Sequence, residues 1–134
     1  MGRKGNKRSL KRLATPGFLQ IERKRRSAGK YFMKPRPGAH PKDFCLPLGH
    51  VLRDVLKLTS NLREAKYLIR KSKIMVDGKI LKDHRYPVGL MDVITIPDIN
   101  KAYRILPSIH SGLIVSEISN DLANIKLCRI ENKT

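Results

Sequence analysis

The chain has 134 residues, a formal net charge of +18 and an isoelectric point near 10.4. This length fits one ordinary domain with extensions, and the charge predicts a polyanionic partner, either nucleic acid or an anionic membrane surface. Apolar runs fall far short of the roughly 20 residues that cross a bilayer, so we expect no membrane anchor.

Cys45 and Cys128 lie far apart and the histidines lack ligand spacing, so we expect buried free thiols, no metal and no cofactor.

Residues 1–43 are the most basic part of the chain. They hold fourteen Lys and Arg against two acidic residues, a net charge of +12. Proline and glycine at 15–17, 34–38 and 40–41 interrupt any long helix or strand, so we expect an extended arm. Two interpretations stay open: a solvated, disordered tail, or an arm that orders on RNA with its arginines on phosphates.

Two amphipathic helices are predicted next. Apolar residues at 48, 51, 52, 55 and 56 follow helical spacing, with His50, Arg53 and Lys57 on the opposite side. A second helix is expected to begin near Asn61, an N-cap residue with Glu64 three positions later. On a wheel of about 100° per residue, the basic residues at 63, 66 and 70 of this helix gather away from its apolar side.

The remaining patterns predict strands. Residues 74–76 and 79–81 flank Asp77-Gly78, which is typical of a type I′ hairpin turn, and 93–96 follow as another strand. Residues 102–106, 113–118 and 125–130 are predicted as further strands with exposed edges. The expected core of this last region is Ile109, Leu113, Val115, Leu122 and Leu127.

The order of these motifs carries a resemblance. L-x-x-V-L, R-E-A-x-x-L-I, I-x-V-D-G-K and P-V-G-x-x-D-V-I-x-I together resemble the S-four RNA-binding domain. The stretches 10–14, 35–38, 52–56, 86–94, 126–128 and 132–134 resemble the S-four-e family of small-subunit ribosomal proteins of archaea and eukaryotes. The resemblance implies an α+β fold: a basic extension at 1–43, an S-four-type module at 44–97 and an incomplete central β region at 98–134.

Two features depart from the family pattern. Ser72 stands between helix and hairpin where the family usually has glycine. If that backbone is left-handed, serine costs on the order of 1 kcal/mol there. Family members also continue past Asn132-Lys133-Thr134 into a further sheet and a KOW-type domain, which this sequence lacks.

The resemblance implies a structural constituent of the small ribosomal subunit, located in the cytoplasm on the ribosome. Its partners would be small-subunit rRNA and neighbouring ribosomal proteins, and we expect no enzymatic activity, small-molecule substrate or membrane contact. Two alternatives are an accessory RNA-binding piece of an RNA-modifying enzyme and a nonspecific basic nucleic-acid binder. A catalytic domain would need more chain than the module leaves.

RNA contacts are expected from two sets of basic residues. Those of the module are Arg63, Lys66, Arg70, Lys71, Lys73 and Lys79, with Arg53 and Arg85 as weaker candidates. Those of the arm are Arg3, Lys4, Lys7, Arg8, Lys11, Arg12, Arg23, Lys24, Arg25, Arg26 and Arg36.

Overall fold

The computed structural model describes residues 8–15, 17, 19, 21, 23, 29–110 and 112–134. Its helices and strands confirm the α+β class, and none of the described helices is long and apolar enough to cross a membrane. In chain order they are β1 (Ser9–Lys11), β2 (Tyr31–Met33), β3 (Cys45–Pro47), α1 (Leu48–His50), α2 (Leu62–Arg70), β4 (Met75–Val76), β5 (Lys79–Ile80), β6 (Pro87–Gly89), β7 (Val93–Ile96), β8 (Lys101–Ser108) and β9 (Gly112–Ile118).

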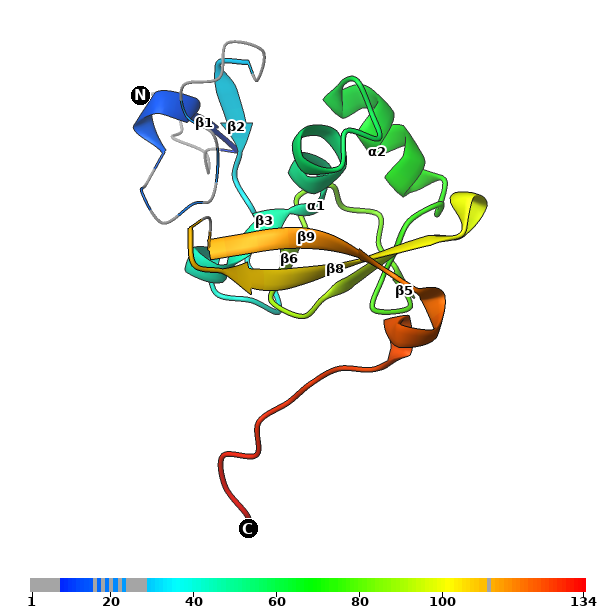
Figure 1. Ribbon diagram of the computed structural model, residues 1–134. Coiled ribbons are helices and arrows are strands. Elements are labelled where there is room, and N and C mark those ends of the chain that lie inside the picture. The colour runs from blue at the N-terminus through cyan, green and yellow to red at the C-terminus, as the bar shows by residue number, and fades with distance from the viewer. Residues whose placement is uncertain are drawn as a thin grey trace.

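One antiparallel sheet runs through most of the molecule in the order β5-β4-β7-β8-β9, and two short pairs, β1-β2 and β3-β6, stand beside it. The helices lie together on one side of the β8–β9 ribbon (Figure 1). Ile69 of α2, Ile94 of β7 and Ile105 of β8 are fully buried in one core. Strands from 98–134 therefore extend the sheet of the preceding residues and share their core.

The Asp77-Gly78 turn has the predicted type I′ geometry. Both residues have positive φ, 50° and 73°, and Val76 pairs with Lys79 across the hairpin. Asp77 also ties the turn to β7, because its N–H donates to Val93 O (2.9 Å) and its Oδ1 accepts from Val93 N (3.0 Å). The hairpin is thereby held in register against the central strand.

The first helix differs from the prediction. α1 continues into one π-helical turn at Val51–Val55, in which Leu56 N donates to Val51 O (2.8 Å). This wider turn shifts the register of the residues within and after it, and Val55 is exposed. His50, which precedes the turn, is buried rather than on the solvent side because Phe32 of β2 packs edge-on against its ring.

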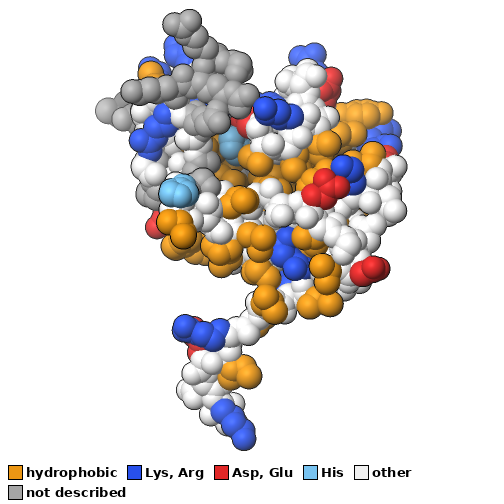
Figure 2. All heavy atoms as spheres, viewed as in Figure 1, with side chains coloured by type: hydrophobic (Ala, Val, Ile, Leu, Met, Phe, Trp, Pro, Cys, Tyr) orange, Lys and Arg blue, Asp and Glu red, His pale blue; other side chains and the backbone are white. Residues whose placement is uncertain are grey.

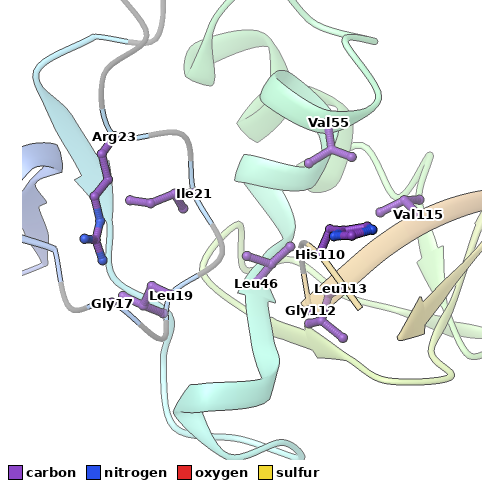
Figure 3. Close-up of a pocket in the computed structure, with 10 residues that line it drawn as sticks. All are labelled: Gly17, Leu19, Ile21, Arg23, Leu46, Val55, His110, Gly112, Leu113 and Val115. Atoms are coloured by element: carbon purple, nitrogen blue, oxygen red, sulfur yellow. The ribbon is translucent and has the colours of Figure 1, made fainter. Parts of the chain in front are cut away.

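The N-terminal segment is only partly an extended arm. β1 and β2 pair with each other, and Phe32 of β2 is fully buried beside the module. Figure 3 shows Leu19 and Ile21 on one side of a pocket of about 470 Å³, with Leu46 and Leu113 on its other side. The described part of residues 8–35 therefore packs apolar side chains on the module, which a solvated tail does not do.

Three predictions for the C-terminal region are wrong: a strand, part of the core and the burial of a thiol. Residues 125–130 form no strand in the described chain, and a 3₁₀ turn, Asn120–Asn124, precedes them. Leu113 is buried and Val115 packs on the main core. The other three expected core residues, Ile109, Leu122 and Leu127, are exposed, as is Cys128, which was expected to be buried.

The tail after the 3₁₀ turn runs away from the body (Figure 1). It is anchored near its start, where Lys126 Nζ lies 2.6 Å from Asp77 Oδ2 and 3.5 Å from Asp92 Oδ1. Arg104 Nη2 also donates to Leu122 O (2.6 Å). Figure 2 shows hydrophobic side chains together with Lys or Arg side chains on this side of the molecule. Ile114 of β9 is exposed, and by the strand register it shares a face of the β8–β9 ribbon with Arg104 and Ser116.

Ser72 occupies a left-handed position at the end of α2. Its φ is 58°, its N–H donates to Ile69 O (3.1 Å), and Lys73 N donates to Leu68 O (3.2 Å). These two bonds form a Schellman motif, in which glycine is the favoured residue at the left-handed position. The backbone at this junction is therefore left-handed, which is the condition under which serine was expected to cost stability.

Replacing Ser72 by glycine is therefore expected to stabilise the protein by about 1 kcal/mol, because glycine adopts positive φ without a Cβ clash. The free energy of unfolding from urea titration measures this change. Ser72→Ala is the matched control, because alanine keeps the Cβ and should bring no such gain. Equal stability of the two variants would contradict the proposed strain.

Candidate nucleic-acid interface

α2 carries the largest group of predicted contacts. Its start is fixed by two hydrogen bonds that resemble a capping box: Asn61 Oδ1 accepts from Glu64 N (3.0 Å), and Glu64 Oε2 accepts from Ser60 N (2.8 Å), the residue before the N-cap. Ala65 and Ile69 are buried against the core. The side turned away from the core bears Arg63, Lys66 and Arg70, and Lys71 follows at the C-cap.

The loop between β5 and β6 adds positive charge next to this helix. Burial lowers the pKa of His84, and the nearby charges of Lys66, Arg85 and Arg70 lower it further, against the opposing effect of Asp83. An influence of this kind requires these cations to lie close to one imidazole. Lys66 and Arg70 of α2 and Arg85 of the loop therefore all lie within electrostatic range of His84, although at least fifteen residues separate Arg85 from the two helix residues in sequence.

The segment before β3 joins this surface through Arg85. Arg85 Nε donates to Lys34 O (2.9 Å), and Arg36 N donates to Arg85 O (2.9 Å). The Arg36 side chain pairs with Asp83 at 2.7 Å, but it is largely exposed, so this pair contributes little and can exchange for another anion. We name the whole surface the basic face: Lys34, Arg36, Lys66, Arg70, His84 and Arg85.

An open pocket of about 470 Å³ indents the basic face beside Arg85. It is lined by residues 34–38 and 40–42 together with Arg85, and none of these lining residues is acidic. Four Lys and Arg surround it: Lys34, Arg36, Lys42 and Arg85. A concave surface with several cationic donors suits phosphate oxygens, which accept charge-assisted hydrogen bonds.

Three other predicted module contacts lie away from the basic face, and two of them are engaged with carboxylates of the protein. Arg53 makes two 2.8 Å hydrogen bonds to the carboxylate of Asp54, and Lys73 pairs with Asp98. Lys79 is exposed in β5, at the edge of the sheet. None of these three residues is linked to the basic face by a described contact.

The predicted arm contacts fall into two groups, those within the described residues and those outside them. Arg8, Lys11 and Arg23 are exposed. The predictions for Arg3, Lys4, Lys7, Lys24, Arg25 and Arg26 lie outside the described residues.

Arg12 requires a correction. Its side chain is only 3% exposed, its Nε donates to Gly29 O (3.1 Å), and its Nη2 lies 3.7 Å from Asp54 Oδ2. The guanidinium also stands 6.0 Å from the centre of the Phe32 ring. Arg12 therefore holds the N-terminal segment on the module, and we no longer count it among RNA contacts.

Asp54 is the centre of that attachment. Besides Arg12 and Arg53 it faces His50, whose Nδ1 lies 2.7 Å from Asp54 Oδ2, and the His50 ring meets Phe32 edge-on with centres 5.0 Å apart. Burial opposes ionisation of Asp54, but the bonds from Arg53 and His50 hold its pKa well below its usual range. The carboxylate is thus ionised in the folded protein.

Sequence reasoning missed Lys34, Lys42 and His84 as members of this region. Lys34 lies in a loop, Lys42 begins a 3₁₀ helix and His84 lies in a turn. The only local signal was their position in or near the stretches Pro-Arg-Pro-Gly and Asp-His-Arg-Tyr. Their proximity to α2 depends on contacts across about fifty residues, such as that between Arg85 and Lys34. Spacing along the sequence does not contain this information.

Comparison with known proteins accounts for nearly the whole length. A model of the RS4NT (NUC023) domain matches residues 4–43, the S4 domain matches 51–94, and ribosomal family S4e matches 99–134. The chain belongs to the ribosomal family S4e. The three matches follow one another in the order expected from the sequence motifs.

Individual S4e relatives agree. Small ribosomal subunit protein eS4 of Methanocaldococcus jannaschii is 44% identical over all of this chain and 53% of the relative, and that of Staphylothermus marinus is 45% identical over all of the chain and 52% of the relative. The crystal structure of the S4e protein of Thermoplasma acidophilum has 32% identity and a TM-score of 0.51, covering 61% of this chain and 42% of that one. The chain thus spans about half the length of these curated relatives.

Proposed function

We propose that this protein is a structural constituent of the small ribosomal subunit that binds small-subunit rRNA without catalysing a reaction. The observation that carries the proposal is the basic face, which gathers cations from α2, the β5–β6 loop and residues 34–36 on a folded module. Membership of the S4e family and relatives named small ribosomal subunit protein eS4 support it. Its place in the cell would then be the cytoplasmic ribosome, beside other ribosomal proteins.

In this proposal the folded module determines where the protein lies on the rRNA, and its positive charge supplies the affinity for the rRNA. Cations that neutralise phosphates release counterions, so binding is strong and depends steeply on salt. The packed segment around Arg12 and Phe32 would orient the remaining N-terminal cations relative to the basic face. The exposed arm residues Arg8, Lys11 and Arg23 would add further phosphate contacts.

The test is to measure binding of the full chain to small-subunit rRNA and to duplex DNA of equal length across a salt series. We expect tighter binding to rRNA at every salt concentration, with log affinity falling steeply with log salt for both. Equal affinities and equal slopes would indicate the nonspecific nucleic-acid binder instead. The comparison is decisive because net charge alone cannot distinguish the two polyanions.

A further inference from the structure

Tyr67 is an aromatic residue of α2 that the core does not use. Its side chain is 59% exposed, whereas the core side of the helix is formed by Ala65 and Ile69 with Leu62 and Leu68 partly buried. A tyrosine directed to solvent from the middle of a capped helix has no packing role to explain it. The position is rigid, because α2 is fixed at both ends.

The surroundings of Tyr67 are cationic. At about 100° per residue, Tyr67 projects between Arg63 and Lys71, about 40° from each, and about 60° from Arg70. Lys71 Nζ stands 5.7 Å from the centre of the Tyr67 ring, a distance at which the ammonium interacts with the aromatic face. Glu64 lies about 60° away on the other side of Tyr67, where its carboxylate accepts from Ser60 N (2.8 Å). Tyr67 is therefore an exposed ring with Arg63, Arg70 and Lys71 around it.

An exposed ring among phosphate-binding cations suits one kind of ligand. Every nucleobase has a face that stacks on an aromatic side chain, but bases within a duplex are already stacked on their neighbours. Proteins stack aromatic side chains mainly on bases of single-stranded loops, bulges and ends. The required ligand is therefore an unpaired nucleotide whose flanking phosphates reach Arg63 and Lys71.

We propose that Tyr67 is a stacking platform for an unpaired nucleotide of the bound RNA. The proposal rests on the proposed function of RNA binding and gives it a local specificity: α2 would prefer a bulged or looped site to a continuous duplex. Arg63, Arg70 and Lys71 hold the sugar-phosphate backbone, and the ring selects for a base that is free to stack.

The test uses two RNA hairpins of equal length, one with a single-nucleotide bulge bearing a fluorescent adenine analogue and one fully paired. Tyr67→Leu should weaken binding to the bulged hairpin by about 5- to 100-fold, because stacking on an aromatic ring is lost, and leave the paired hairpin within about twofold. Tyr67→Phe keeps the ring and should bind both hairpins as the original chain does. The analogue's fluorescence should be quenched on binding by the original chain and by Tyr67→Phe, but not by Tyr67→Leu.

Phe44→Leu is the matched control, because Phe44 is similarly exposed, at 61%, but lies beside Asp43 outside α2. It should leave both affinities unchanged. Equal losses of Tyr67→Leu on both hairpins, or no loss on the bulged one, would overturn the stacking proposal. Failure of the chain to prefer rRNA over DNA would instead overturn the proposed function, so the two failures are distinguishable.

Discussion

Replacing Asp54 by alanine is expected to lower the free energy of unfolding by about 3 kcal/mol. The change removes the carboxylate that faces Arg12 and His50, two side chains that are almost completely buried. A buried cation that loses a neighbouring carboxylate loses part of the interaction that offsets its desolvation, which is why breaking such a pair is far more costly than breaking a surface pair. Urea unfolding measures the total loss, and hydrogen exchange in residues 8–15 and 29–35 should show the N-terminal segment opening first.

Asp121→Ala is the matched control for this substitution. Asp121 is exposed in the 3₁₀ turn near the C-terminus, and its removal should change stability by less than about 0.5 kcal/mol. Similar losses in the two variants would contradict a central role of Asp54. Unchanged exchange in the N-terminal segment of Asp54→Ala would contradict the attachment through Arg12.

The same carboxylate predicts how stability depends on pH. The folded-state pKa of Asp54 lies below the ordinary value of 3.8, so the unfolded chain binds more protons in this range and stability rises with pH. The contribution is complete above about pH 4 and is lost as the pH falls toward the folded-state pKa. Asp54→Ala should therefore unfold with a shallower pH dependence below about pH 4 than the original chain.

Replacing Lys66 and Arg70 together by alanine is expected to weaken rRNA binding roughly tenfold. The slope of log affinity against log salt concentration should become less steep by about 1 to 2. Both residues belong to the basic face and lie near His84. Alanine is a good helix former, so α2 should remain folded. A filter-binding or fluorescence titration at several salt concentrations gives affinity and slope together, and urea unfolding checks the fold.

Arg129→Ala with Lys133→Ala removes the same charge from the exposed C-terminal tail, which extends away from the body (Figure 1). This control should have a clearly smaller effect on both affinity and slope. Equal effects of the two double variants would mean that net charge, and not the basic face, determines binding. In that case the cations of the face would be ordinary solvent-exposed residues.

Much of the fold was readable from local patterns. Asn61 and Glu64 marked the start of α2, Asp77-Gly78 marked the type I′ turn, and Ser72 marked a left-handed junction. Each of these signals depends on the conformational preferences of a few adjacent residues, which are nearly independent of the rest of the chain. They were confirmed for that reason.

The errors have a common cause as well. His50 was predicted on the solvent side because the helix was considered alone, but the N-terminal segment covers that side: the His50 ring packs edge-on against Phe32, and its Nδ1 faces the Asp54 carboxylate that also meets Arg12. Residues 125–130 have the composition of a strand, but a strand also needs a neighbouring backbone to pair with, and the described chain gives them none. Both outcomes depend on partners distant in sequence.

The sequence by itself determined the α+β class, the hairpin, the helix caps and the excess of positive charge. That charge predicts a polyanionic partner. Only the tertiary structure decided which cations stand together. In the folded protein Arg12 is buried beside Asp54, and Arg53 and Lys73 form ion pairs with carboxylates. Lys34 and Arg36 contact Arg85 through hydrogen bonds. The physical reason is that charge count is additive along a chain, whereas the exposure and pairing of each charge depend on how the core places its neighbours.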